Sequence, residues 1–164
     1  MEVEIITLAA KKLIGIRMPF TLGENIPAEL WRTFMPRKKE IKNKVNEELI
    51  SMEIYENGLD LNAFNHTTIF EKWAAIEVTS FDNLPEGMES YALEGGKYAY
   101  FLHKTAERTM EALFDYIFKT WLPTSGFTLA NRPHFGVMGE KYRGMHHPES
   151  EEGIWIPVEL KKET

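Results

Sequence analysis

The 164-residue chain contains no cysteine. This absence excludes disulfide bonds, thiolate nucleophiles and cysteine-based metal sites. The chain also lacks an apolar run of membrane-spanning length. Its first eight residues alternate apolar and acidic side chains, which is unlike a signal peptide. We therefore expect a cytoplasmic protein without a membrane partner.

Basic stretches are scarce as well. The 19 Lys and Arg residues are outnumbered by 25 Asp and Glu, so the formal net charge is −6, and both signs are mixed along the whole chain. Binding to nucleic acid requires a basic face, and no helix-turn-helix pattern is visible. We therefore expect no direct nucleic-acid binding and interpret the net charge mainly as a source of solubility.

Apolar and aromatic residues, by contrast, are plentiful. Hydrophobic residues make up 43% of the chain and aromatic residues 12%, which is typical of a globular protein with a sizeable core. Most aromatic side chains will pack in that core, and the surplus is available to line a pocket. No phosphate-binding glycine loop or nucleophilic serine turn is present, and we expect no cofactor.

The apolar periodicity predicts one order of elements, strand, strand, helix, strand, strand, which occurs twice. The strands expected in the first copy are 1–8, 12–18, 49–55 and 72–79. Its helix runs from Pro27 to about Val45, with a kink or break at Pro36.

The second copy repeats this order. The strands expected there are 90–93, 97–103, 134–139 and 153–160. Its helix covers 106–121 and is capped by Thr105. The dipeptide Gly95-Gly96 is typical of a tight turn, so we expect the first two strands of this copy to form a hairpin.

A local match supports a duplication. The segment WAAIEV, which begins at Trp73, resembles WIPVEL, which begins at Trp155, at an offset of 82 residues. An offset of this length is typical of two fused half-domains. We therefore predict a single domain over 1–164, with a first repeat at about 1–82 and a second at about 88–164. The predicted fold is α+β, with antiparallel sheets, helices on one face and pseudo-two-fold symmetry.

The strand alternation brings candidate ligand-binding residues together. Side chains alternate between the faces of a strand, and we expect one surface between the repeats to carry the following five residues: Glu53, Tyr55, Trp73, Met138 and Trp155. Aromatic rings beside a carboxylate suit flat, apolar or cationic ligands. The alternatives are packing of both Trp residues at the seam and a solvated strand face for Glu53 and Glu77.

Two pairs of histidines are candidate functional groups. His146 and His147 are adjacent, so on a strand they would point apart, and no cluster of acids completes a metal site. We therefore expect no metal. His103 and His134 are candidates for acid or base roles, but neither has a partner nearby in the sequence, and no catalytic residue is assigned.

Four segments of the second half resemble the GyrI-like small-molecule-binding family in order and spacing. They are GGKYAYFLHK (95–104), WLPTSGF (121–127), RPHFG (132–136) and IWIPV (154–158), and FEKWAAIEV (70–78) adds a weaker match in the first half. That family is similar to the effector-binding domains of multidrug-sensing transcription regulators and to a bacterial gyrase inhibitor. The resemblance implies a duplicated β-α-β-β (SHS2-like) unit, with a groove carboxylate that binds cationic, lipophilic compounds.

The sequence departs from the family at this carboxylate. The resemblance places the usual Glu and Tyr at Gly136 and Met138, so both groups are missing there. The pseudo-symmetric partners of these positions are Glu53 and Tyr55. We hypothesise that the groove acid has moved to Glu53. The full predicted ligand-binding set is Glu53, Tyr55, Trp73, Tyr98, Phe101, Met138 and Trp155.

The predicted fold, the candidate residues and the family resemblance together suggest three functions. The first is a stand-alone effector-binding domain for a lipophilic, possibly cationic small molecule. The second, implied by hydrolase-like members of the family, is hydrolysis of reactive electrophiles in the same groove. The third is a gyrase-inhibitor-like interaction module, whose partner would be a regulator or gyrase. Exposed edge strands would also allow a homodimer.

Overall fold

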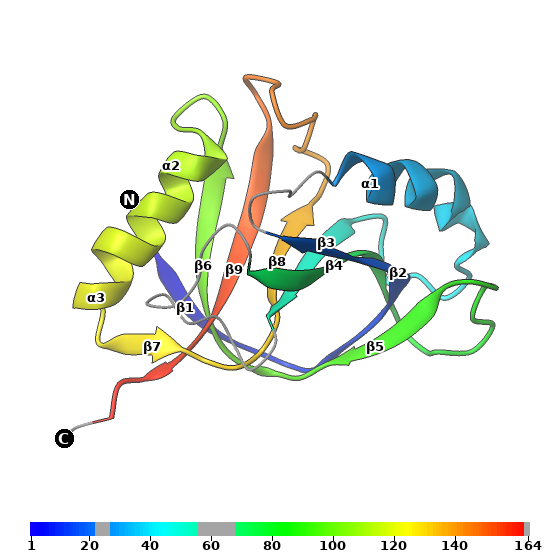
Figure 1. The fold of residues 1–164 in the computed structure, drawn as a ribbon, viewed down its shortest axis with the longest axis horizontal. Coiled ribbons are helices and arrows are strands. Elements are labelled where there is room, and N and C mark those ends of the chain that lie inside the picture. Colours follow the sequence, from blue (N-terminus) through cyan, green and yellow to red (C-terminus); the bar gives the residue numbers. More distant parts are fainter. Residues whose placement is uncertain (22–26, 56–67, 163–164) are drawn as a thin grey trace.

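The computed structural model describes residues 1–21, 27–55 and 68–162. A strongly curved antiparallel sheet carries helices on one face, which confirms the α+β prediction (Figure 1). The strands are β1 (Glu4–Leu8), β2 (Lys11–Thr21), β3 (Leu49–Tyr55), β4 (Ile69–Val78), β5 (Glu89–Leu93), β6 (Gly96–Lys104), β7 (Phe127–Leu129), β8 (His134–Met138) and β9 (Glu151–Leu160). Within these ranges, no helix is long and apolar enough to cross a membrane.

The strand order shows the duplication. It is β1-β6-β9-β8-β3-β4-β2-β5, with β7 paired to β9 off this path. When each strand is exchanged for its counterpart in the other half, the same order is read from the opposite end. The pseudo-two-fold axis therefore passes between β3 and β8, which pair directly, with Ser51 opposite Gly136.

The hairpin expected at Gly95-Gly96 is wrong. β5 pairs with β2, and β6 pairs with β1, so the two strands lie far apart in the sheet order. A Cβ on Gly95 would lie 2.6 Å from the carbonyl oxygen of Leu8 and 2.9 Å from the nitrogen of Ala10. Glycine is needed here because the β5–β6 connection passes directly against the β1–β2 connection.

The first helix is shorter than predicted. It comprises α1 (Ala28–Phe34) and the 3-10 helix η1 (Met35–Glu40), and the break expected at Pro36 falls at the start of η1. Ile41 is already extended, and Lys44 forms an isolated bridge to Val78 of β4. Val45 is 47% exposed and belongs to no helix. Pairing with β4 has therefore overridden the helical periodicity of this segment.

The second helix begins later than predicted. It comprises α2 (Met110–Asp115), the π-helical stretch η2 (Tyr116–Trp121) and α3 (Leu122–Thr124). Its cap is Thr109, whose Oγ1 accepts a hydrogen bond from the Ala112 nitrogen, so the prediction of Thr105 as the cap is wrong. The predicted apolar stripe does face the core, and Leu113 and Ile117 are fully buried against β6 and β9.

The two sheet faces are distributed differently from the prediction. Residues opposite one another on paired strands share a face, and Met52 lies opposite Trp73 while Glu53 lies opposite Lys72. Trp73 is therefore on the face away from the helices, and Glu53 is on the face that carries them. We name these the aromatic face and the helix face. The aromatic face includes Trp73, Tyr91, Tyr98, Phe135 and Trp155.

Candidate functional site

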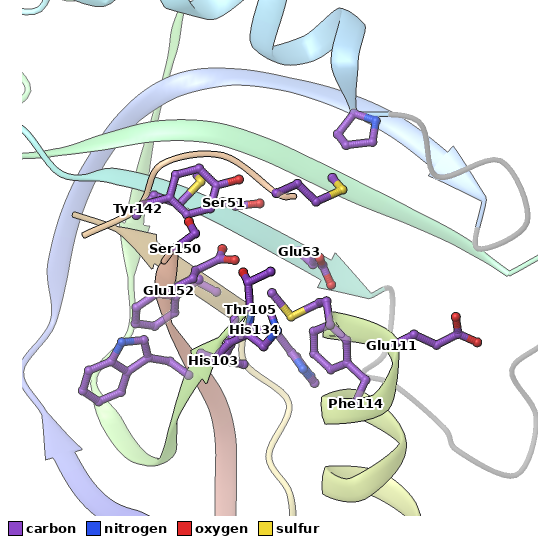
Figure 2. Close-up of a pocket in the computed structure, with 18 of the residues that line it drawn as sticks. Ser51, Glu53, His103, Thr105, Glu111, Phe114, His134, Tyr142, Ser150 and Glu152 are labelled. Atoms are coloured by element: carbon purple, nitrogen blue, oxygen red, sulfur yellow. The ribbon is translucent and has the colours of Figure 1, made fainter. Parts of the chain in front are cut away.

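A cavity of about 560 Å³ opens on the helix face, over the central strands β3, β8 and β9 (Figure 2). Its walls come from α1, from the first turn of α2 and from the segment between β8 and β9. Its volume is within the range of small-molecule sites. The large apolar side chains around it are Trp31, Met110, Phe114, Met138, Met145 and Ile154.

One acid of this cavity is already neutralised. Lys72, only 8% exposed, places its Nζ 3.6 Å from Oε1 of Glu53. The Tyr55 hydroxyl donates a hydrogen bond of 2.9 Å to the other oxygen of Glu53. Burial, together with the neighbouring charge of Glu53, raises the pKa of Tyr55, so this phenol stays a donor. Glu53 is thus held by two partners from the first repeat.

A second acid, Glu152 of β9, enters the same cavity, and a third, Glu111 of α2, is exposed (Figure 2). In the described part of the chain, no hydrogen bond or ion pair joins the Glu152 carboxyl group to another side chain. Burial raises the pKa of Glu152 to about 7, the Lys72 charge opposes this rise, and the Glu53 charge adds to it. Glu152 is therefore a half-buried carboxyl group without a cation.

Gly136 makes room for this carboxyl group. A Cβ on Gly136 would lie 2.5 Å from Oε1 of Glu152. A side chain at position 136 would therefore push this flexible carboxyl group aside, and the glycine leaves room for it. The place where the family resemblance puts a Glu side chain is thus occupied by a carboxyl group from the neighbouring strand.

Two histidines complete the polar lining. His134 on β8 is buried, and burial lowers its pKa to about 4, so its ring is neutral at neutral pH. Its ring packs edge-on against Tyr55, with 5.3 Å between the centroids. His103 lies opposite Glu152 in the β6–β9 register, and its Nε2 is 2.8 Å from the carbonyl oxygen of Arg108, to which it can donate. His134 therefore contributes a flat, uncharged wall.

The structure brings together only part of the predicted ligand-binding set. The cavity is lined by Glu53, Met138 and Trp155. Tyr55 lies beside it, hydrogen-bonded to Glu53. Trp73 and Tyr98 are buried on the aromatic face, and Phe101 is buried beneath the second helix, 5.2 Å from the Trp121 ring. The predicted grouping with Glu53 therefore fails for Trp73, which the register places on the other face, whereas Trp155 borders the same cavity as Glu53.

Glu152 is the main residue that the sequence analysis missed. The last strand was expected to begin at residue 153, whereas β9 begins at Glu151. A signal was present, because alternation backwards from Ile156 and Ile154 places Glu152 on the helix-facing side. Across the residues that the structure describes, no three His, Asp or Glu side chains are grouped to hold a metal ion.

The cavity has the size of a small-molecule site, and the sequence comparison identifies a domain of that class. Residues 1–159 match the model of the GyrI-like small molecule binding domain, and the chain belongs to this family. The transcriptional regulator BrlR of Pseudomonas aeruginosa is 25% identical over 158 residues. This alignment covers 96% of the chain and 56% of BrlR, so the chain spans about half the length of that regulator.

Solved structures share the fold. SAV2435 bound to tetraphenylphosphonium superposes with a TM-score of 0.69 at 14% identity, covering 97% of this chain and 94% of that one. The C-terminal domain of EcmrR gives a TM-score of 0.69 at 12% identity, covering 98% of each chain. These likenesses confirm the predicted fold.

Proposed function

We propose that the cavity on the helix face binds a lipophilic small molecule that carries one positive charge. The observation that carries this proposal is Glu152, a carboxyl group beside apolar walls that forms no ion pair with any residue that the structure describes. Such a group is costly to ionise when it is alone, and a ligand cation would neutralise it. Trp31 and Phe114 supply aromatic rings, and the methionines supply adaptable apolar contacts.

The relatives support this proposal. The SAV2435 structure holds tetraphenylphosphonium, a lipophilic cation, and BrlR is a transcriptional regulator. We therefore propose that this domain senses or sequesters its ligand, as an effector-binding module does. Any regulatory output would pass through a partner or a further domain.

Paired ions of matched shape test the proposal. Tetraphenylphosphonium and tetraphenylborate differ in charge sign at nearly the same size, and each would be titrated into the protein while tryptophan fluorescence is recorded. We expect saturable binding of the cation and much weaker binding of the anion. Equal binding of both ions, or binding of neither, would contradict the proposal.

A tryptophan variant locates the binding site. Trp31 lines the cavity, whereas Trp121 packs against Phe101 and Phe127 outside it. Because Trp155 also borders the cavity, we expect Trp31→Phe to remove a large part of the fluorescence change caused by tetraphenylphosphonium and Trp121→Phe to retain all of it. The reverse pattern would place the ligand elsewhere.

A further inference from the structure

Glu152 shares its cavity with titratable and charged groups from every surrounding element. They are Glu53 from β3, Lys72 from β4, His103 from β6, Glu111 from α2, His134 from β8, and Tyr142 and His146 from the β8–β9 segment. Glu53 and Lys72 neutralise each other, and His134 is neutral. Burial raises the pKa of Tyr142, and the Glu152 charge adds to this rise, so the phenol is uncharged as well.

The internal ion pair decides which acid is available to a ligand. Lys72 is opposite Glu53 in the β3–β4 register, and it forms an ion pair with Glu53 and none with Glu152 among the described residues. A lysine stem is flexible and carries a compact charge. Without the Glu53 carboxylate, Lys72 would be free to turn towards Glu152, the other half-buried acid of the cavity; the third acid, Glu111, is exposed.

We infer, on the basis of the proposed function, that the cationic ligand and a proton compete for Glu152, and that Glu53 acts by keeping Lys72 away from it. Binding then ionises the carboxyl group: the O–H bond of Glu152 breaks, the proton leaves to solvent, and the carboxylate pairs with the ligand cation. Glu53 is in this account a positioning residue, and the cavity accepts one charge per ligand.

The competition has a definite pH dependence. Because the pKa of Glu152 is about 7, the acid is about half protonated at neutral pH and mostly ionised at pH 8. Apparent affinity for a permanent cation should therefore fall about tenfold from pH 8 to pH 6. At pH 7 about half a proton should be released for each ligand bound.

Calorimetric titration of the whole chain with tetraphenylphosphonium tests this inference. Titrations at pH 6, 7 and 8, in buffers of different ionisation enthalpy, count the protons released. We expect Glu152→Gln to lose at least about tenfold in affinity at pH 8 and to release no proton from this site. The matched control is Glu151→Gln, which changes the adjacent carboxylate; this residue lies outside the cavity and pairs with Lys141.

A second pair of variants tests the role of Lys72. Glu53→Gln should weaken binding because Lys72 becomes free to pair with Glu152, and adding Lys72→Met should restore the affinity. Thermal unfolding of each variant separates loss of binding from loss of folding. If the double variant binds as weakly as Glu53→Gln, Glu53 contacts the ligand itself and its assigned role is wrong.

The outcomes separate this inference from the proposed function. Absence of tetraphenylphosphonium binding at every pH would overturn the proposed function. Binding with an unchanged affinity and an unchanged proton count in Glu152→Gln would overturn the inference alone. Proton release that disappears in Glu152→Gln and persists in Glu151→Gln would support it.

Discussion

The two repeats have the same backbone order and place charge differently at matching positions. In the first repeat, Glu53 of β3 lies opposite Lys72 of β4, and the two form an ion pair. In the second repeat, the matching pair is Gly136 of β8 and Ile154 of β9. Neither residue is charged, and Gly136 has no side chain. The first repeat is therefore neutralised internally, and the second leaves open space on its strand.

The second repeat carries its acid, Glu152, two residues before Ile154 on β9. Glu152 on β9 matches Phe70 on β4 at the 82-residue offset. Phe70 is buried against Tyr55, with 5.5 Å between the ring centroids, whereas Glu152 turns its carboxyl group into the space over Gly136. These differences between the repeats place one carboxyl group without an ion-pair partner among the described cavity residues, and the proposed binding of a singly charged ligand rests on that group.

The largest expected effect is a loss of stability when Gly15 of β2 is changed. Its counterpart in the second repeat is Tyr98 of β6. A Cβ on Gly15 would collide with the carbonyl oxygen of Ala74 and lie 2.7 Å from the Cα of Ala75. Because both obstacles are backbone atoms, Gly15→Ala should lower the free energy of unfolding by about 3 kcal/mol. Urea denaturation measures this loss.

A second glycine serves as the control. A Cβ on Gly139 would meet only the flexible side chain of Glu48, at 3.0 Å. Gly139→Ala should therefore cost less than about 1 kcal/mol. Equal losses at Gly15 and Gly139 would show that the close approach of β2 to β4 is not as tight as described.

The next largest effect is a difference in the free energy of unfolding between variants of Glu152 and of Glu53. The folded-state pKa of Glu152 is raised to about 7, so its contribution to stability is present below about pH 4.5 and is lost as pH rises through 7. Glu152→Gln should therefore be more stable than the wild type at pH 8, by on the order of 2 kcal/mol, and no more stable at pH 4.5. Glu53→Gln should be less stable at pH 8 because it leaves Lys72 buried without its partner.

Urea denaturation at the two pH values makes this comparison. If both variants shift the free energy of unfolding in the same direction at pH 8, the repeats do not differ in the way described. The result is independent of any ligand.

His134 produces the opposite pH dependence. Its folded-state pKa is lowered to about 4, so its contribution to stability is present above about pH 6.5 and is lost as pH falls through 4. In a Glu152→Gln background, which removes the opposing contribution, we expect on the order of 2 kcal/mol to be lost between pH 7 and pH 4. His134→Gln should reduce this loss, and an unchanged loss would assign it to other groups.

The smallest effect concerns the aromatic face. The Tyr98 hydroxyl donates a hydrogen bond of 3.0 Å to the carbonyl oxygen of Pro133. Tyr98→Phe should lower the free energy of unfolding by about 1 kcal/mol, because this buried acceptor loses its donor. Tetraphenylphosphonium affinity should not change, since Tyr98 lies outside the cavity. A change in affinity would connect the two faces of the sheet.

The sequence predicted much of the fold because local alternation and helical spacing mark where elements lie. The failures were non-local. Gly95-Gly96 has the composition of a turn, yet its strands pair with partners in the other repeat. Alternation also shows which residues of one strand share a face, whereas only the register shows that Trp73 meets Met52 and not Glu53.

The candidate site was less predictable for the same reason. Glu53 was identified by symmetry with Gly136, but its partner Lys72 depends on the β3–β4 register. Glu152 lies two residues before the apolar part of β9, outside the strand as predicted from its composition. Its position over Gly136 follows from the pairing of β8 with β9, which no local pattern specifies.

The most direct test of the account is a crystal structure of the protein with tetraphenylphosphonium bound. We predict that the phosphonium lies beside the carboxylate of Glu152 in the cavity on the helix face, with the Lys72–Glu53 ion pair intact. A phosphonium beside Glu53 with Lys72 displaced, or one bound on the aromatic face near Trp73, would contradict it.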